Sequence, residues 1–414
     1  MTPRERVMQA FAHRQPDRVP LDFAGHRSSG IAAIAYAKLR SHLGLPKLPL
    51  RVYDVIQQLA VVDEDVLGRF GVDAVEMGRG FADGAKDWQD WVLPGGTPCS
   101  IPAWTRVERV ADRWVLRSAT GTAMGRMPDG ALYFEQEHFP FAEADDLSAV
   151  PAAFEQCMWT SSLTASPPGP LAAGAEGEKH LREGARRFRA RTDRAIVGLF
   201  GGNLLEIGQF LYRNDNFFML LAAEPARAEA FLDTVVELHL ASLRRFLGAV
   251  GDSIDVIVFG DDLGMQSGPQ ISPEMYRRIF KPRHSLMWKT AKSLAPVKVM
   301  LHCCGGVREL LPDLIDAGLD AINPVQITCS GMEPRGLKRD FGKDLLFWGG
   351  GCDTREVLPH GTPQEVRDHV RRQVEIMASD GGFVFQQVHN ILANVPPENI
   401  VAMFDAVRGS DPSR

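Results

Sequence analysis

The chain has 414 residues, of which 45% are hydrophobic and 24% are charged, and its formal net charge is −6. This size and composition suit a globular protein with a large core, either one (β/α)8 barrel with insertions or two domains. The negative net charge gives no basic footprint for nucleic acid. No stretch reaches the roughly 18 apolar residues of a membrane span, and the first twenty residues lack the apolar run of a signal peptide. We therefore expect a cytoplasmic protein with no nucleic-acid or membrane partner.

Short apolar runs alternate with helical patterns along the chain. This alternation predicts an α/β fold, a (β/α)8 TIM barrel that forms a single domain over residues 1–414. The eight expected strands cover residues 18–23, 73–77, 195–200, 254–259, 297–301, 321–325, 345–348 and 383–388. The helices expected between them include residues 225–247, 273–294, 307–317 and 363–379. Ser272 and Thr362 each precede a proline, a pattern typical of an N-cap followed by the first helical position.

Residues 85–190 interrupt this alternation between the second and third strands, and we interpret them as a β-rich insertion. Antiparallel hairpins are predicted from strands at 105–110, 113–118 and 131–135. The Pro/Gly/Ala-rich stretch 162–178 is expected to form an exposed loop. The aromatic residues of the insertion could form an exposed docking rim for a partner protein, or they could pack the insertion onto the barrel. These residues are Trp88, Trp91, Trp104, Phe134 and Phe139.

His302 and Cys304 end an apolar run and are followed by two glycines. Residues two apart in a strand point to the same side, so the imidazole and the thiol would project together. Both are zinc ligands, and a catalytic zinc site uses three protein ligands with one open position. His389, at the end of the last expected strand, is the favoured third ligand, and Cys352 in GGGCDT is its rival. A buried cysteine beside a hydrogen-bonded histidine is the alternative without a metal.

Catalytic groups of a TIM barrel lie at the carboxyl ends of its strands. Polar side chains follow most of the expected strands in this chain. We expect catalytic roles for Asp261 and Glu206, and substrate contacts from Arg79, Asn203, Gln326 and Asn390. Adjacent residues of an extended segment face opposite ways, so only one of Asp261 and Asp262 is expected at the barrel mouth. We assign Asp261 to the mouth, where it could orient a ligand histidine or accept a substrate proton, and Asp262 to its loop.

Several longer stretches occur in a characteristic order. They are RERVMQAFAHRQPDRVPLDF, DDLG with SPEMYRRIFKPR, LHCCGGVRELLPDLIDAGLDAINPVQ, WGGGCDT with LPHGTPQEV, and HNILANVPPENIVAMFDAV. Together they resemble the uroporphyrinogen decarboxylase superfamily. More narrowly, they resemble its corrinoid-dependent methyltransferase branch, which includes the methylcobalamin:coenzyme M methyltransferases. The resemblance covers most of the chain outside residues 85–190, and it implies a TIM barrel.

Methyltransferases of this branch hold zinc on an H-x-C pair and a later cysteine near a P-x-E-N segment. His302 and Cys304 match the pair, but the third position falls on His389 here, which implies a less negative His2Cys zinc site. The resemblance implies an EC 2.1.1-type enzyme that moves a methyl group between a small methylated substrate, or a thiol, and a corrinoid. The corrinoid, a cobalamin, would be free or carried by a partner protein.

Two other functions stay open. One is a metal-free decarboxylase or lyase acting on a carboxylated small molecule, with Asp261 and His302 in acid–base roles. The other is a non-catalytic barrel that binds corrinoid or tetrapyrrole partners. The decarboxylases proper carry an arginine-rich GRY-type motif and an aspartate after the second strand, where this chain has LDFAGHRSS and MGRGF. This difference disfavours an octacarboxylate substrate.

Overall fold

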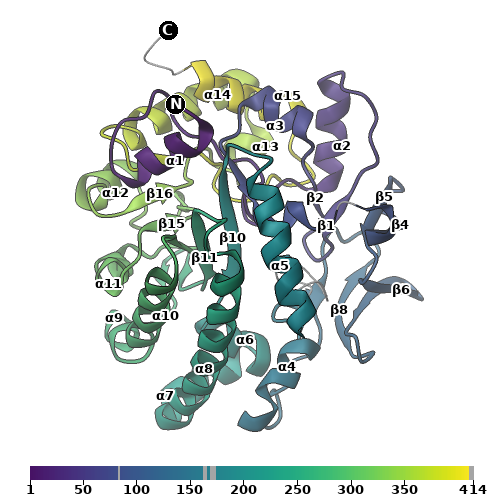
Figure 1. The fold of residues 1–414 in the computed structure, drawn as a ribbon, viewed down its shortest axis with the longest axis vertical. Coiled ribbons are helices and arrows are strands. Elements are labelled where there is room, and N and C mark those ends of the chain that lie inside the picture. The colour runs from purple at the N-terminus through teal and green to yellow at the C-terminus, as the bar shows by residue number, and fades with distance from the viewer. Residues whose placement is uncertain (83, 162–165, 168–173, 410–414) are drawn as a thin grey trace.

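The computed structural model describes residues 1–82, 84–161, 166–167 and 174–409. A curled sheet of seven parallel strands forms the centre, with helices packed around it (Figure 1). In spatial order the strands are β17 (Phe383–Val384), β16 (Leu346–Trp348), β15 (Ala321–Asn323), β14 (Lys298–His302), β11 (Val256–Gly260), β10 (Ala195–Gly201) and β3 (Ala74–Glu76). Each barrel strand predicted from residue 73 onward overlaps one of these seven. The parallel α/β fold is therefore confirmed.

The predicted first strand, residues 18–23, is reduced to two single bridges. Leu21 pairs with Phe385 and Asp22 pairs with Ala74, both in the parallel sense. Pro20 has no N–H group, which limits how far a ladder can extend at this point. Because Phe385 follows β17 and Ala74 begins β3, the segment joins the two outer strands of the sheet. The ring is closed, as in a TIM barrel.

Helix α1 (Pro3–Phe11) fills the amino end of this ring. It begins at a capping box, in which the Thr2 hydroxyl accepts from the Glu5 N–H at 3.2 Å and the Glu5 carboxylate accepts from the Thr2 N–H at 2.9 Å. Val7, Ala10 and Phe11 pack into the inner core with small and branched residues of the strands. The amino end of the barrel is therefore plugged.

The other helices surround the sheet. They are α2 (Ala33–His42), α3 (Glu64–Phe70), α6 (Leu205–Tyr212), α7 (Asn214–Ala223), α8 (Pro225–Val250), α11 (Leu311–Ala317), α12 (Pro334–Phe341), α13 (Val357–His360), α14 (Pro363–Met377) and α15 (Pro397–Gly409). The helix predicted at 273–294 is interrupted: a π-helical turn, Tyr276–Phe280, separates α9 (Pro273–Met275) from α10 (Lys281–Leu294). Pro282 explains the break, because proline cannot donate to the preceding turn. None of the helices in the described ranges is long and apolar enough to cross a bilayer.

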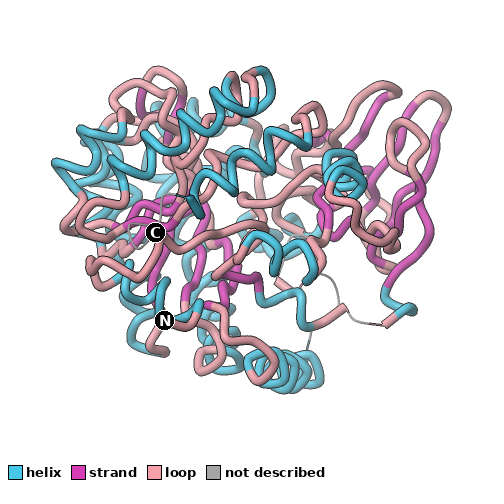
Figure 2. The backbone as a smooth tube through the Cα atoms, turned by 90° about the horizontal axis from the view of Figure 1, so that it is seen from above, coloured by secondary structure: helices cyan, strands magenta, loops and turns pink. Residues whose placement is uncertain are grey.

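Between β3 and β10 the chain forms two antiparallel sheets, which lie to one side of the barrel (Figures 1 and 2). One pairs β4 (Trp88–Val92) with β5 (Pro98–Pro102), and the other contains β6 (Arg106–Val110), β7 (Arg113–Arg117), β8 (Ala123–Pro128) and β9 (Glu135–Gln136). The strands predicted at 105–110 and 113–118 correspond to β6 and β7. The strand predicted at 131–135 is wrong except for Glu135, which begins β9; the strand β8 precedes it and ends just before a turn in which Gly130 has a φ of 82°.

Two helices complete this part of the chain. They are α4 (Val150–Gln156) and α5 (Gly174–Arg189), and α5 packs against α8. The exposed loop predicted at 162–178 falls largely outside the described residues, which omit 162–165 and 168–173. Residues 174–178 of that stretch are helical instead, in the first turns of α5. The remaining short strands are β1 (Val52–Asp54), β2 (Leu59–Ala60), β12 (Gly264–Met265) and β13 (Gly268–Pro269).

Candidate functional site

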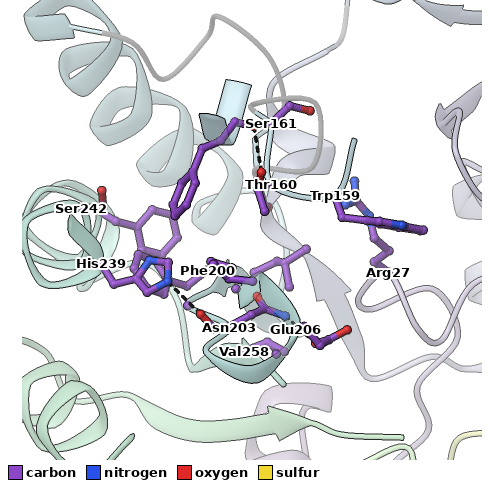
Figure 3. A pocket seen from close by; sticks show the side chains of 18 of the residues that line it. Arg27, Trp159, Thr160, Ser161, Phe200, Asn203, Glu206, His239, Ser242 and Val258 are labelled. Carbon is purple, nitrogen blue, oxygen red and sulfur yellow. Dashed lines mark hydrogen bonds between the residues drawn. The ribbon is translucent and has the colours of Figure 1, made fainter. Parts of the chain in front are cut away.

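A cavity of about 750 Å³ lies at the carboxyl end of the barrel. Its floor is formed by residues at the ends of β10, β11 and β14 and after β17, including Asn203, Asp262, His302, Cys304 and His389. Residues of α4, of the segment that follows it and of α8 form the other walls (Figure 3). The cavity therefore lies where catalytic groups of TIM barrels are placed.

His302, Cys304 and His389 come together on this floor. Their candidate ligand atoms all lie within 4.8 Å of one another. His302 is the last residue of β14 and Cys304 follows two residues later, so both side chains project from one strand end. His302 Nε2 lies 3.5 Å from Cys304 Sγ, and the two imidazole rings have their centroids 5.5 Å apart. All three side chains are half-buried and line the cavity.

The chemistry of this cluster fits a zinc ion. Zinc bonds of about 2.1 Å to nitrogen and 2.3 Å to sulfur at a tetrahedral angle leave these atoms about 3.6 Å apart. The observed 3.5 Å between His302 Nε2 and Cys304 Sγ agrees with that spacing. Burial and the nearby His302 lower the pKa of His389 to about 3, which keeps its imidazole neutral, the form that binds metals. Three donors facing a cavity leave room for a further ligand.

Cys352, the rival third ligand, lies elsewhere. Its thiol is fully buried and its Sγ is 3.8 Å from the carbonyl oxygen of Asp353. Burial raises the pKa of this thiol above its usual value, with a further contribution from the Asp353 charge. Cys352 is in neither the donor cluster nor the described cavity lining. The three glycines before it do not bring its sulfur to the floor.

The two adjacent aspartates have roles opposite to those expected. Asp261 is completely buried, and its carboxylate accepts from the N–H groups of Leu205 and Glu206 at 3.1 and 3.0 Å. These are free N–H groups in the first turn of α6, which attract a carboxylate. Asp262 lines the cavity instead, and its Oδ1 accepts from the Cys304 N–H at 2.7 Å. The assignment of Asp261 to the mouth is therefore wrong.

Glu206 faces the cavity from the first turn of α6. Its carboxyl group accepts a 2.6 Å hydrogen bond from Nδ2 of Asn203, which also lines the cavity. Burial raises the pKa of Glu206 well above its ordinary value, and the charges of Asp262 and Asp261 raise it further. The site therefore favours a protonated glutamic acid close to the donor cluster.

Arg79 does not reach the cavity. It belongs to the 3₁₀ helix Met77–Gly80 that follows β3, and its guanidinium donates to the Val62 carbonyl at 2.6 Å. Its nearest ionic partner is Glu64, at 3.8 Å. The short helix turns this side chain toward α3. A substrate contact from Arg79 is therefore not supported.

The side chains of Gln326 and Asn390, like that of Arg79, form hydrogen bonds with backbone groups and do not line the cavity. Gln326 Oε1 accepts from the Gly305 N–H at 2.7 Å, which fixes the chain directly after Cys304. Asn390 Oδ1 accepts from the Gly30 N–H at 2.8 Å. Neither side chain is in the described lining of the cavity. Both amides therefore hold loops in place. The prediction failed because a side chain at a strand end can turn sideways to a neighbouring loop as easily as into the cavity.

Sequence reasoning missed the aromatic walls of the cavity. Trp159 stacks on Phe210 with ring centroids 6.1 Å apart, while Phe200 packs against Phe246 at 6.0 Å and His239 at 6.2 Å. Figure 3 shows Phe200 and His239 on one side of the cavity and Trp159 on the other. These residues come from three separate segments, and no local pattern marks them as neighbours.

Arg27 was missed as well. It lines the cavity next to Trp159 (Figure 3), and its Nε is 2.9 Å from Asp54 Oδ2. It belongs to the segment AGHRSS, which stands in place of the arginine-rich motif of the decarboxylases. The arginine of this segment was the one sequence feature that could have indicated a side chain at the cavity.

The five aromatic residues of the expected docking rim do not form an exposed patch. Trp91 and Phe134 are buried, at 8% and 4% exposure. Trp88, Trp104 and Phe139 are half-buried. The described wall of the cavity contains none of the five. The expected exposed rim is therefore not supported, and the burial of these rings agrees better with the alternative that they pack the insertion onto the barrel.

A family model described as uroporphyrinogen decarboxylase (URO-D) matches residues 204–410, half of the chain, and this range contains Glu206, Asp262 and the donor cluster. The chain belongs to the uroporphyrinogen decarboxylase family. A methyltransferase from Methanosarcina mazei has a similar structure, with a TM-score of 0.58 and 17% sequence identity over 99% of each chain. At this identity the likeness shows a shared fold. No curated protein matches the chain.

Proposed function

We propose that this member of the uroporphyrinogen decarboxylase family is a zinc-dependent methyltransferase that passes a methyl group from a small methylated substrate to a corrinoid. The observation that carries the proposal is the cluster of His302, Cys304 and His389, whose donor atoms face the cavity. A zinc ion held there would act as a Lewis acid and improve the leaving group of the methyl donor. The methyltransferase with a similar fold supports this choice of reaction.

Donor activation fits the residues around the cluster better than thiol activation. A neutral ether or amine needs a proton on its oxygen or nitrogen when the methyl group leaves, whereas a thiol acceptor must lose one. Glu206 favours its protonated form because of burial and the neighbouring carboxylates, which raise its pKa, so it can supply that proton. Asn203 orients the Glu206 carboxyl group. A cobalt(I) corrinoid would supply the nucleophile that accepts the methyl group, and the Glu206 carboxyl group would give its proton to the oxygen or nitrogen that is released.

The cavity favours a substrate with an apolar body. Phe154, Trp159, Phe200, Phe210 and Phe246 line its upper part. Aromatic walls bind flat or apolar groups well and give no favourable place to several carboxylates.

The charges of the lining also disfavour a polycarboxylate. Arg27 and Arg245 are the cationic side chains in the described lining, and Arg27 already forms an ion pair with Asp54. Four acidic side chains share the lining: Glu155, Glu178, Glu206 and Asp262. A decarboxylase acting on an octacarboxylate would need more cationic than acidic side chains in this lining.

The test combines metal analysis with a transfer assay. Protein purified without chelators should contain one zinc per chain. A panel of methylated oxygen and nitrogen donors, including aromatic ones, should yield methylcobalamin from free cob(I)alamin with at least one donor. Cys304→Ala should lose both the zinc and the activity. Protein that never takes up zinc, or that transfers methyl groups equally well as Cys304→Ala, would overturn the proposal.

A further inference from the structure

A chain of buried polar side chains lies beneath the donor cluster, inside the barrel. It begins at Asn323, which ends β15 directly opposite His302 in the parallel register of β14 and β15. Asn323 is fully buried, and its Oδ1 lies 2.8 Å from His302 Nδ1. The chain continues from Asn323 through Gln386 to His26.

The surroundings of Asn323 fix which way its amide faces. Its Nδ2 donates to the backbone carbonyl of Trp348 at 2.8 Å and to Gln386 Oε1 at 2.7 Å. A carbonyl oxygen only accepts, so the amino group must face Trp348 and the amide oxygen must face His302. An amide oxygen has no proton to give. His302 Nδ1 must therefore carry the proton of this hydrogen bond, and its Nε2 is left with a lone pair.

Gln386 is held in the same way. It is fully buried, its Nε2 donates to the Ser28 carbonyl at 3.0 Å, and its Oε1 therefore accepts from Asn323. The same Oε1 lies 3.1 Å from Nε2 of the buried His26, while His26 Nδ1 accepts from the Ser28 N–H at 3.3 Å. A hydrogen bond with a backbone group thus fixes the orientation of each of the three side chains, Asn323, Gln386 and His26. The amide of Asn323 cannot flip without breaking several buried hydrogen bonds.

We propose that Asn323 is a positioning residue that holds His302 in the tautomer whose bare Nε2 faces Cys304 and the cavity. Imidazole in the other tautomer would present an N–H toward the cluster and could bind a metal only after the proton moved. The inference rests on the proposed zinc site for its purpose, but the tautomer itself is a property of the metal-free chain. Partners of this kind typically change metal affinity about 10–100-fold when removed.

Zinc and cobalt(II) titrations of three variants test the proposal. Asn323→Leu removes the acceptor, and we expect its zinc Kd to rise about 10–100-fold. Asn323→Asp restores an acceptor for His302 Nδ1, and its Kd should lie within a few-fold of the wild-type value. Cobalt(II) bound to Asn323→Leu should also show a changed ligand-field spectrum. Asn323→Leu that binds zinc as tightly as the wild type would overturn the proposal.

Asn399 provides the matched control. It is also a buried asparagine whose Nδ2 donates to two backbone carbonyls, those of Leu358 and Gly361, at 2.9 and 2.7 Å. Asn399→Leu should lower stability as Asn323→Leu does, yet leave the zinc Kd and the cobalt spectrum unchanged. An equal loss of affinity in both variants would show that general destabilisation is the cause, and the proposal would fail.

A measurement on the wild-type protein covers the case in which the variants do not fold. Nitrogen-15 NMR of histidine-labelled, metal-free protein in mildly alkaline buffer, where imidazole is neutral, reports the tautomer of each ring. The signals of His302 are assigned as those lost in His302→Gln. We expect the Nδ1–H form, and an Nε2–H form would overturn the proposal. If the wild type binds no zinc but shows the Nδ1–H form, the proposed function fails and the positioning role toward His302 stands.

Discussion

Asp262 Oδ1 accepts a 2.7 Å hydrogen bond from the backbone N–H of Cys304 and lies 3.9 Å from His302 Nε2. This one carboxylate therefore holds the backbone of one candidate ligand and faces the ring of another. We expect Asp262→Ala to weaken zinc binding about 10–100-fold, because the Cys304 segment loses its anchor. The change in melting temperature should be small, since Asp262 is half-buried at the cavity. Metal titration and thermal unfolding of the same preparations check both parts.

Asp261→Asn should mainly lower the stability of the fold, whereas Asp262→Ala should mainly weaken zinc binding. Asp261 is completely buried, accepts from two N–H groups of α6, and lies 3.2 Å from His284 Nε2. An asparagine would turn its amino group toward at least one of these donors. We expect the free energy of unfolding to fall by about 1–3 kcal/mol, the cost of unsatisfied buried polar groups. Urea denaturation measures it, and an unchanged midpoint would contradict this role.

The barrel could be predicted because its strands are marked in the sequence by short apolar runs. Runs such as 254–259 and 297–301 are apolar except for Asp255 and Lys298 near their starts, as expected for strands covered on both faces, and each is followed by polar residues. The pair of His302 and Cys304 was visible for the same reason, since strand periodicity fixes which neighbours share a side. The strand at 123–128 was missed, because its sequence AMGRMP lacks the β-branched residues that mark a strand.

The orientation of individual strand-end side chains could not be predicted. Asp261 and Asp262 were correctly placed on opposite sides, but which side faces the cavity depends on where α6 begins. Arg79, Gln326 and Asn390 follow strands as expected, yet each binds a backbone group of a loop that is distant in sequence. The aromatic walls are set by the packing of α4 and α8 over the mouth. Local patterns carry no information on such contacts.

Replacing His389 and Cys352 separately decides between the two candidate third ligands. His389→Ala removes a donor from the cluster, so we expect zinc to bind at least about 100-fold more weakly or to be lost during purification. Cys352→Ala should keep one zinc per chain, because this thiol is buried away from the cluster. It should instead lower stability modestly through the small void that it leaves. Retention of zinc by His389→Ala and its loss from Cys352→Ala would reverse the assignment.

His239 makes the stability of the fold depend on pH. This histidine of α8 is buried and donates to the Asn203 carbonyl at 3.0 Å, and burial lowers its pKa to about 4 from an ordinary value of 6.5. Between pH 6.5 and pH 4 the unfolded chain therefore binds a proton at this position and the folded chain does not. The free energy of unfolding should fall as the pH falls through this window, by up to about 3 kcal/mol from this group.

His239→Gln isolates that contribution, since glutamine keeps a donor for Asn203 and does not titrate. Other buried histidines titrate in both proteins and cancel in the comparison. We expect the unfolding free energy of the wild type, taken relative to that of the variant, to fall by up to about 3 kcal/mol between pH 7 and pH 4. Urea denaturation at several pH values gives both curves. Parallel curves would show that His239 is not the source of the dependence.

The final prediction concerns Glu206 as the proton donor. Its pKa is raised well above the ordinary value by burial and by Asp262 and Asp261, so the acid form persists at higher pH than for a free glutamate. If this form protonates the leaving group, kcat should be high below the raised pKa and fall as the pH rises through it. Glu206→Gln cannot give a proton and should lower kcat about 10²–10⁴-fold, with no such fall. Glu237, an exposed residue of α8, offers a control, since Glu237→Gln should keep the wild-type profile. A pH-dependent fall in kcat that persists unchanged in Glu206→Gln would assign the titrating group elsewhere, because the variant has no carboxyl group at position 206.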